Sequence, residues 1–573
     1  MERRILLKRN LYHAEKIRDI RTLVRRAADL YDQRIAYKEI GSDKEIVEYS
    51  FSRLEEDMDA LGTALLHKGF EGKHIAILSE NSYAWVLSYL AVINGVGVVI
   101  PMDKELTDED IITLLKKSDA DALICSETFY PSLENILANC PKLESCIIIS
   151  SLPKEKYITL NELIDLGKKL LEEGVRDYLG APIPVENMSE IIFTSGTTGA
   201  NKGVMLSQKN IMSVVYGAFH LIKPGKVSIS VLPLNHSYEC SCHILGGIYW
   251  GLTVCFNDSL KNLTKNLKRF CPDFTIMVPL FLESIDKLIW KTSKEVGLVG
   301  HLKYGIKFSN LIRKLHIDQR RRFFKPILES FGGNLEQVVC GGAPLRNETI
   351  TAFDNLGINV VNGYGISECA PLVAANCTAW KRLGSVGYIV PICQVRIMNK
   401  DRNGSGEIQV KGDNVMLGYY KDEAATKSTF TEDGWFITGD LGYLDKDNFL
   451  YLTGRDKNLI ILPNGKNVHP EELEETITSS IPYVKEVVVT SSIGNKLDES
   501  SIHAYIYFDP SSVQESGYEN LRSQIKADIK KINRRLAVYK RISSIFISEK
   551  EFEKTTTKKI KRQALREEDF ISA

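Results

Sequence analysis

The 573-residue sequence lacks the features that would place it across a membrane, outside the cell or on nucleic acid. No apolar run approaches the roughly 18–20 residues that span a bilayer. The basic start, Met1–Asn10, has no signal-peptide core or cleavage site. Lys+Arg and Asp+Glu both total 73, so no global charge favours nucleic acid. We therefore expect a cytoplasmic protein without a transmembrane segment, and a weak membrane-surface role for Met1–Asn10 stays open beside that of a solvated lead-in.

Metal-ligand cysteine spacing is also missing. The eleven cysteines are scattered, and Cys240 and Cys242, with His243 beside them, have no second ligand pair at zinc-finger spacing. The pattern predicts small buried thiols in a reducing compartment. Hydrophobic residues make up 44% and charged residues 25%, the balance of a soluble globular protein. The length predicts about three or four domains.

The first half of the chain alternates helical and strand patterns. Phe51–His67 has apolar residues at helical spacing, and Thr107 precedes a further helix that runs to Ser118. The other expected elements are a helix over 83–94 and strands over 73–78, 97–101 and 122–125. Repeated strand–helix–strand units of this length predict parallel sheets covered by helices.

The pattern of predicted secondary structure changes after about Gly384. Short strand patterns with glycine turns predict a small β-rich subdomain over about 384–453. Beyond Gly454, helices over 471–480 and 521–536 alternate with strands over 484–490 and 502–508. The sequence therefore predicts an α/β protein. Its large N-terminal domain, 1–455, contains helix-flanked mixed sheets and the β-rich subdomain, and an α+β C-terminal domain follows over 456–573.

The most informative segment is Ile191–Val204. Its apolar start predicts a strand that leads into a loop of glycines and hydroxyls with one lysine, Lys202, and a helix-like segment follows. Glycine lets backbone N–H groups approach a ligand closely, and hydroxyls and a lysine suit an oligophosphate. The spacing is not that of the Walker A loop. An ordinary surface turn is the alternative interpretation.

Four more segments suit different parts of a magnesium–ATP complex. Tyr364, between two glycines, offers a flat face to adenine, and Glu368 is a hard oxygen ligand for Mg²⁺. Asp440, which we place on a β turn, and Arg455 suit a ribose diol, while Lys559 suits the negative charge of a reacting phosphate. Each segment alone has an ordinary structural interpretation: a turn, a surface ion pair or a solvated lysine-rich face. Their shared order favours one nucleotide site.

With these motifs in order, the chain resembles the adenylate-forming superfamily of acyl-CoA synthetases, peptide-synthetase adenylation domains and luciferases, and most of all long-chain fatty acyl-CoA ligases. The likeness covers nearly the whole chain, from about residue 20. It rests on the segments 194–203, 364–368, 435–440 and 454–458. The resemblance implies ATP, Mg²⁺ and coenzyme A as cosubstrates and a mobile C-terminal domain that carries the adenylation lysine.

The resemblance also implies a role for each matching residue. The catalytic residues would be Lys559, Lys202, Glu368 and His236, with Glu368 as the metal ligand. Lys457 would be the hinge, and a loop at the thiol tunnel would contain Asn464, Gly465 and Lys466. The nucleotide would contact Thr194, Ser195, Gly196, Thr197, Thr198, Gly342, Ala343, Pro344, Asn362, Gly363, Tyr364, Gly365, Ser367, Asp440 and Arg455.

The sequence departs from the family pattern at three positions. Glu553 and Lys558 stand where relatives usually have proline and glycine, and Asn201 stands where proline is common. Ile560 and Arg562 fix the register of the adenylation lysine at Lys559 rather than Lys558. The charge that the reaction needs is therefore kept.

The reaction that the resemblance implies has two steps. A carboxylate attacks the α-phosphorus of ATP and expels pyrophosphate, and a thiol then attacks the acyl-adenylate and releases AMP. The segment 232–239 has no aspartate to hold an amino acid and resembles the Pro-Leu-x-His of fatty acyl and aryl ligases. Its histidine is His236, and the apolar run 244–254 suits a lipid tunnel or a buried core helix. We expect a medium- or long-chain fatty acid.

Several alternatives stay open. The thiol acceptor is coenzyme A or the phosphopantetheine of an acyl carrier protein, and the acid is fatty or aryl. A non-catalytic homologue and a luciferase-like oxygenase are the other classes. The basic, aromatic insertion over 284–335 resembles that of long-chain synthetases and suits peripheral contact with an anionic membrane or an acyl carrier protein, or simply a solvated face.

Overall fold

The computed structural model describes residues 11–150, 152–154, 156–195, 201–402, 404–462, 467–493, 496–497, 501–554 and 560–572. The chain divides into two compact units, here called unit 1 and unit 2. Unit 1 comprises Met1–Gln394 with Val410–Phe436, and unit 2 comprises Val395–Gln409 with Ile437–Ala573. The α/β fold class that the sequence predicts is confirmed, and the domain boundary at 455/456 stays a prediction.

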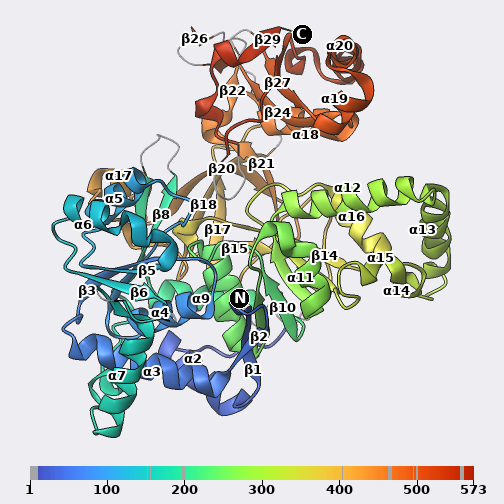
Figure 1. The fold of residues 1–573 in the computed structure, drawn as a ribbon. Helices are drawn as coiled ribbons and strands as arrows, with labels where there is room; N and C mark the ends of the chain where they lie inside the picture. The colour runs from blue at the N-terminus through green and yellow to red at the C-terminus, as the bar shows by residue number, and fades with distance from the viewer. Residues whose placement is uncertain are drawn as a thin grey trace. The chain divides into compact units, whose positions relative to one another are not determined.

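Unit 1 contains an eight-stranded sheet whose core is parallel, as the alternating pattern predicts (Figure 1). Strands β3, β4, β5 and β6 pair in parallel, and β8 pairs in parallel with β4 and antiparallel with β9. The sheet order is β19 (Gly418–Tyr419), β9 (Asn201–Ser207), β8 (Met188–Ser195), β4 (Gly97–Pro101), β3 (Lys73–Leu78), β5 (Ala122–Ser126), β6 (Ser145–Ile149) and β7 (Ile158–Thr159).

The helices around this sheet begin where the sequence places their caps. Helix α3 (Phe51–His67) buries its apolar face and begins after Ser50, whose side chain accepts a hydrogen bond from Arg53 N–H. Helix α5 (Asp108–Lys117) is capped by Thr107. Three acidic residues occupy its first turn and two lysines its last turn, which complements the helix dipole. Helix α4 (Tyr83–Ile93) is apolar all round and is buried.

A second sheet in unit 1 has a parallel centre and antiparallel edges. Parallel strand ends of this kind bring loops together at one edge of the sheet. Its order in unit 1 is β16 (Gly387–Ile389), β15 (Leu372–Ala375), β14 (Asn359–Gly365), β13 (Gln337–Cys340), β12 (Phe274–Met277), β10 (Val227–Ser230), β11 (Thr253–Phe256), β1 (Ile35–Ile40) and β2 (Ile46–Ser50).

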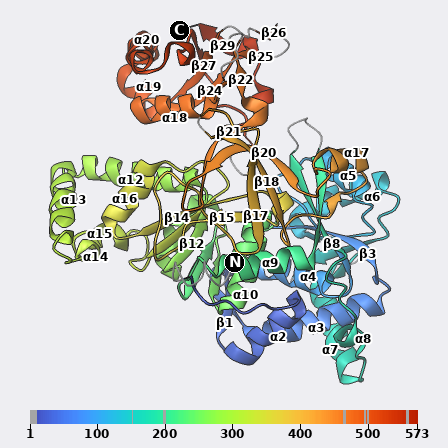
Figure 2. The same cartoon turned by 180° about the vertical axis from the view of Figure 1, so that it is seen from behind.

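The insertion over 284–335 is helical. It forms a group of helices beside the second sheet, and α13 lies at the outer end of that group in both views (Figures 1 and 2). The group consists of α12 (Pro279–Glu295), α13 (Val299–Arg313), α14 (Arg320–Phe323) and α15 (Lys325–Glu329), with α16 (Asn347–Leu356) packed against α12 and α13.

Besides the short pairs β22 (Ile460–Ile461) with β23 (Asn467–Val468) and β25 (Ser492–Ile493) with β26 (Lys496–Leu497), unit 2 contains two larger groups of strands. A four-stranded sheet packs against α18 (Pro470–Ser480) and α20 (Tyr518–Arg535) around a buried core. Its strands are β24 (Val484–Thr490), β27 (His503–Phe508), β28 (Ser544–Ser548) and β29 (Phe570–Ser572). The second group consists of β17 (Cys393–Met398), β18 (Gly406–Gly412), β20 (Phe436–Leu444) and β21 (Phe449–Arg455), and the division between the units runs through the first three of these strands.

Three local expectations were wrong. A strand, β9, follows the glycine loop, and the helix α9 (Gln208–Ala218) begins only after Ser207, because Asn201–Ser207 pairs with β8. The sequence predicts a strand over Asn359–Val361 only, but β14 continues to Gly365 because it pairs with β15. Asp440 lies within β20 rather than on a turn, because β20 pairs with β21.

Within the described ranges, no helix combines the length and the apolar composition that crossing a bilayer requires. All eleven cysteines are free. Eight of them are buried, as the sequence predicts, whereas Cys242, Cys271 and Cys393 are only partly buried.

Buried Glu190 on β8 should make stability depend on pH. Its side chain is 1% exposed, and burial raises its pKa from 4.5 to about 8. The folded protein therefore keeps a proton that the unfolded chain releases between those values. The free energy of unfolding should fall as the pH rises through this window, by up to about 1.4 kcal/mol per pH unit. Glu190→Gln should remove that loss, so its melting temperature should exceed the wild-type value increasingly from pH 5.5 to 8 and level off above.

Exposed Glu71 supplies the matched control, because Glu71→Gln makes the same chemical change at the surface. Its melting temperature should follow the wild-type value across the whole pH series. A Glu190→Gln difference that does not change with pH would contradict the proposed titration.

Candidate active site

The β8–β9 hairpin positions three of the residues that the sequence assigns to the phosphates. Antiparallel pairing sets Thr194 opposite Lys202 and Ser195 opposite Asn201. The hairpin therefore brings a hydroxyl and an ammonium group to the mouth of the glycine loop. Gly196, Thr197 and Thr198 lie outside the described residues.

A tyrosine that the sequence analysis did not single out joins Lys202 to Glu368. Strand β19 pairs with β9, which sets Tyr419 opposite Val204. The Tyr419 hydroxyl donates a hydrogen bond of 2.9 Å to Glu368 Oε1, and Lys202 Nζ lies 4.5 Å from the centre of the Tyr419 ring. A cation over an aromatic face is attracted to it. One aromatic side chain thus orients both the predicted phosphate lysine and the predicted metal ligand.

Tyr419 stays a hydrogen-bond donor at any physiological pH. Burial raises its pKa well above its ordinary value, and the negative charge of Glu368 raises it further. The backbone supports the same contact, since Met416 N–H donates to the Glu368 carbonyl at 2.8 Å. With Oε1 held by Tyr419, the orientation of the Glu368 carboxylate is fixed.

The predicted adenine frame lies at the ends of β13 and β14. Gly342 follows β13 with φ +82°, a conformation that favours glycine. Gly365 is required for another reason: a Cβ there would lie 2.2 Å from the Pro371 carbonyl oxygen. The second glycine of Gly-Tyr-Gly therefore permits close backbone approach between β14 and the chain before β15. Tyr364 is 6% exposed and projects into an internal cavity.

This internal cavity, of about 80 Å³, is lined almost wholly by apolar groups. One part of its wall consists of Gly342, Gly363, Tyr364 and Gly365, which the sequence assigns to the nucleotide, with Gly341 beside them. The rest of the wall includes Phe219, Ile222, Tyr238, Cys242, Gly246, Leu252, Phe274, Ile276 and Val339. The cavity thus places an apolar wall directly beside residues that the sequence assigns to the nucleotide.

The cavity wall near Tyr238 is formed by a π-helix, Tyr238–Leu245. A buried hydrogen-bonded chain holds this segment against β10: His243 contacts Glu239 Oε1 at 2.7 Å and Ser228 Oγ at 2.9 Å. All three side chains are fully buried, so this chain acts on packing rather than on a ligand. His236 is half-buried in the turn just before the π-helix, and the cavity wall begins two residues later at Tyr238.

Unit 2 brings the predicted ribose residues together. Antiparallel pairing of β20 and β21 sets Asp440 opposite Arg455, and Arg455 Nε lies 3.0 Å from Asp440 Oδ1. The Asp440 N–H also donates to Thr438 Oγ1 at 3.1 Å. Lys457 lies in the short 3₁₀ turn Asp456–Asn458 that follows β21.

The other predicted residues of unit 2 are Lys559, Asn464, Gly465 and Lys466, and they lie outside the described residues. The chain on both sides of Lys559 is described: Lys554 and Ile560 form an antiparallel bridge. Arg562 then donates to Glu474 Oε1 at 2.6 Å and to the Val489 carbonyl at 3.1 Å.

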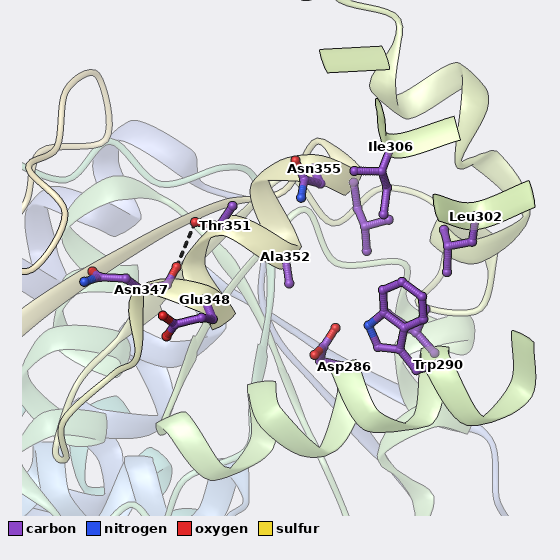
Figure 3. A pocket seen from close by; sticks show the side chains of 11 residues that line it. Asp286, Trp290, Leu302, Ile306, Asn347, Glu348, Thr351, Ala352 and Asn355 are labelled. Atoms are coloured by element: carbon purple, nitrogen blue, oxygen red, sulfur yellow. Dashed lines mark hydrogen bonds between the residues drawn. The ribbon is translucent and has the colours of Figure 1, made fainter. Parts of the chain in front are cut away.

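Unit 1 contains a second cavity that is larger than the one beside Tyr364. This second cavity, of about 330 Å³, lies between α12, α13 and α16 (Figure 3). Its wall contains none of the residues that the sequence assigns to ATP. We therefore place the candidate active site at the smaller cavity.

Comparisons with known proteins agree with the α/β fold described above. The profile of the family described as AMP-binding enzyme matches residues 24–420, and that of the AMP-binding enzyme C-terminal domain matches residues 457–570. A solved structure of the anthranilate CoA ligase AuaEII with anthranoyl-AMP aligns over 96% of both chains, with a TM-score of 0.75 and 20% identity.

Two curated relatives show the extent of the sequence likeness. The long-chain-fatty-acid–CoA ligase ACSBG1 of Rattus norvegicus is 31% identical over 454 residues, 74% of this chain and 62% of the rat protein. FadD15 of Mycobacterium tuberculosis, also named a long-chain-fatty-acid–CoA ligase, is 28% identical over 77% of this chain and 74% of its own. The match thus spans less than two thirds of the rat relative's length.

Proposed function

The chain belongs to the AMP-binding enzyme family, and on this premise we propose that it is an AMP-forming ligase for long- or medium-chain fatty acids. In the proposed reaction, the acid carboxylate displaces pyrophosphate from ATP. The thiol of coenzyme A then takes the acyl group and releases AMP.

One observation supports this proposal most strongly: the wall of the apolar cavity in unit 1 includes Gly342, Gly363 and Tyr364, which the sequence assigns to the nucleotide. An apolar tail in the cavity would desolvate without leaving a polar group unpaired. Its carboxylate, at the Tyr364 end, would face the nucleotide. The names of the rat and mycobacterial relatives agree with an acid of this kind.

Two anions must meet in the first step, so the site must supply positive charge. Lys202 lies at the mouth of the glycine loop, and we propose that Lys559 supplies the second ammonium group. Bound Mg²⁺ would neutralise phosphate charge, and Glu368 would hold it. The described residues contain no group of three or more metal-ligating side chains. A single carboxylate, Glu368, fits Mg²⁺, because this ion is usually bound by one or two carboxylates together with substrate phosphates.

The direct test is acid-dependent exchange of labelled pyrophosphate into ATP by the purified protein. We expect exchange with fatty acids of eight to eighteen carbons and little with benzoate or anthranilate. Exchange with aryl acids alone would instead favour an aryl ligase. Absence of exchange with every acid would refute adenylation and favour a non-catalytic homologue.

The acceptor needs a separate test, because coenzyme A and a carrier protein present the same thiol. Enzyme, ATP and the preferred acid are incubated with coenzyme A or with phosphopantetheinylated acyl carrier protein. We expect acyl-CoA to form faster than acylated carrier protein. Faster loading of the carrier protein would overturn this part of the proposal.

A further inference from the structure

Helix α13 turns large apolar side chains outward. Tyr304 is 72% exposed, Phe308 43% and Leu311 61%, and Leu315 in the turn after the helix is 69% exposed. The spacing i, i+4, i+7, i+11 places these four residues, here called the α13 stripe, within about 60° of one another around a helix. On an ordinary surface helix the apolar stripe faces the core and polar residues face water. The α13 stripe has the opposite orientation.

The inward face of α13 already has apolar residues of its own. Leu302 and Ile306 project into the cavity of about 330 Å³ that α13 shares with α12 and α16 (Figure 3). Leu302 is 7% exposed. Phe308 also contacts Phe323 of α14, with ring centroids 5.9 Å apart, but 43% of Phe308 stays exposed. Packing of the helix onto its neighbours therefore leaves most of the α13 stripe exposed, and four exposed large apolar residues on one face are an unusual surface for a soluble protein.

The charges around the stripe are of one sign. The segment 296–317 contains no Asp or Glu and has Lys303, Lys307, Arg313 and Lys314. At 3.6 residues per turn, the three lysines lie along one border of the stripe, within about 40° of one another. All three are exposed, and none forms an ion pair with another described residue. A basic border beside an apolar stripe is typical of helices that lie on an anionic membrane surface.

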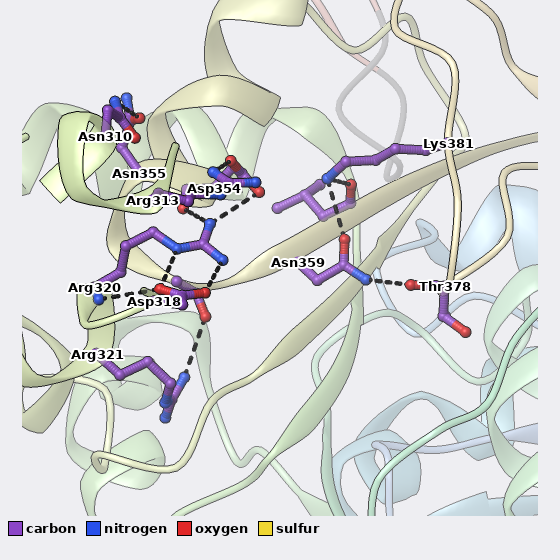
Figure 4. Close-up of polar contacts among 12 residues, drawn as sticks. Asn310, Arg313, Asp318, Arg320, Arg321, Asp354, Asn355, Asn359, Thr378 and Lys381 are labelled. Atoms are coloured by element: carbon purple, nitrogen blue, oxygen red, sulfur yellow. Dashed lines mark hydrogen bonds and ion pairs between the residues drawn. The ribbon is translucent and has the colours of Figure 1, made fainter. Parts of the chain in front are cut away.

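Three arginines of the insertion form contacts within the protein, so they are not part of the exposed basic border. Arg313 Nη1 lies 2.6 Å from Asp354 Oδ2, and Arg320 binds both Asp318 and Asp354 (Figure 4). Arg321 donates to the carbonyls of Leu335, at 2.7 Å, and Gly333, at 2.8 Å. These side chains are used inside the protein.

The same contacts fix α13 in place. Asn310 at the inner side of the helix donates to Asn355 Oδ1 of α16 at 2.8 Å, beside the Arg313–Asp354 pair (Figure 4). The α13 stripe is therefore presented by a helix anchored at several points. A surface ordered in advance loses little conformational entropy when it binds.

From this geometry we propose that α13 docks on the surface of an anionic lipid bilayer. The α13 stripe enters the boundary between headgroups and acyl chains, and Lys303, Lys307 and Lys314 contact lipid phosphates. A protein partner is less favoured, because a bilayer matches both a continuous apolar stripe and an uninterrupted basic border without requiring a shaped pocket. The proposal does not depend on the proposed ligase activity, since docking needs neither ATP nor acid.

The test is sedimentation of the full chain with sucrose-loaded vesicles in the absence of substrates. Vesicles of phosphatidylcholine with 40% phosphatidylglycerol are compared with pure phosphatidylcholine, at low and high salt. We expect binding to the anionic vesicles, with at least tenfold weaker binding to the neutral ones and at high salt.

Two variants separate the contributions. Tyr304→Ser/Phe308→Ser/Leu311→Ser should weaken binding to anionic vesicles at least tenfold. Lys303→Glu/Lys307→Glu/Lys314→Glu should remove the preference for anionic lipid. The matched controls make the same kinds of change elsewhere on unit 1: Leu30→Ser/Leu260→Ser/Leu383→Ser removes three scattered exposed leucines, and Lys261→Glu/Lys265→Glu/Lys268→Glu reverses three lysines near or on α11 (Leu263–Phe270). Both controls should bind like wild type.

Melting temperature checks that each variant is folded, and it does so independently of activity. Folded stripe variants that bind anionic vesicles like wild type would overturn the proposal. The proposal would also be overturned if the wild-type protein does not bind vesicles and instead self-associates through the α13 stripe. Binding of an acidic carrier protein through this stripe, without binding to vesicles, would overturn it as well. Analytical ultracentrifugation of the wild type and the stripe variant identifies those two outcomes.

Discussion

Glu368→Gln is expected to lower acid-dependent ATP–pyrophosphate exchange by about 10³-fold, the cost of removing a preorganised charged group from the place where charge must be balanced. Glutamine keeps the shape of the side chain and its contact with the Tyr419 hydroxyl, but it removes the negative charge that would hold Mg²⁺. Exchange is measured at saturating ATP and acid, with Mg²⁺ varied.

Tyr419→Phe gives a graded comparison, because it keeps the Glu368 charge and removes only the hydrogen bond that orients it. Loss of a group that orients a metal ligand costs about 10- to 100-fold in metal affinity. The phenylalanine variant should therefore regain exchange as Mg²⁺ is raised, whereas Glu368→Gln should stay low at every Mg²⁺ concentration.

The pattern of recovery decides between roles. If raised Mg²⁺ restores both variants equally, Glu368 is not the group that holds the metal. If Tyr419→Phe loses activity without any shift in Mg²⁺ dependence, the tyrosine acts on folding or on Lys202 instead. Melting temperatures of both variants, measured without nucleotide, identify a folding defect.

Much of unit 1 could be predicted from the sequence because its signals are local. Ser50 and Thr107 cap helices that begin where hydrophobic periodicity also begins, and the strands at 73–78 and 97–101 are continuous apolar runs. The order of motifs along the chain then indicated the family.

The errors concern the pairing of strands. Tyr364 and Gly365 extend β14 because β15 lies beside them, and Asp440 belongs to a strand because of β21. No local propensity reports such a partner. Tyr419 was missed for the same reason: it lies 51 positions from Glu368 in the sequence, and only the pairing of β19 with β9 brings them together. Its position within Gly418-Tyr419-Tyr420, after a strand-like stretch, was the one available signal.

The cavity that we propose to hold the acid was also only partly visible in the sequence. The apolar run 244–254 suggested a lipid-facing wall, but the observed wall combines residues from β12, β13, β14 and the π-helix. A cavity arises where side chains from several elements fail to fill space, and this depends on packing rather than on pattern.

The second prediction with a large expected effect concerns this cavity: Cys242→Phe should shift the preference of the enzyme to acids of shorter chain length. Cys242 lines the cavity on the π-helix, and a phenylalanine there would occupy space that we assign to the acyl tail. One methylene in an apolar pocket changes specificity by about 10- to 200-fold. The ratio of kcat/KM for a sixteen-carbon acid to that for an eight-carbon acid should therefore fall by about 100-fold or more, while the KM for ATP stays the same.

Cys242→Ser is the matched control, because it preserves size and leaves the cavity open. Burial raises the pKa of the Cys242 thiol to about 12, so the thiolate is scarce at neutral pH and thiol reactivity does not confound the comparison. The serine variant should keep the wild-type chain-length profile.

The form of the loss tests where the acyl tail lies. Overpacking alone would lower stability by about 1–3 kcal/mol and would reduce activity with all acids together. A loss confined to long acids, in a variant whose melting temperature is close to that of wild type, requires the added ring to lie in the path of the tail. An equal loss for eight and sixteen carbons would remove Cys242 from that path, and with it the argument that the cavity beside Tyr364 selects the acid.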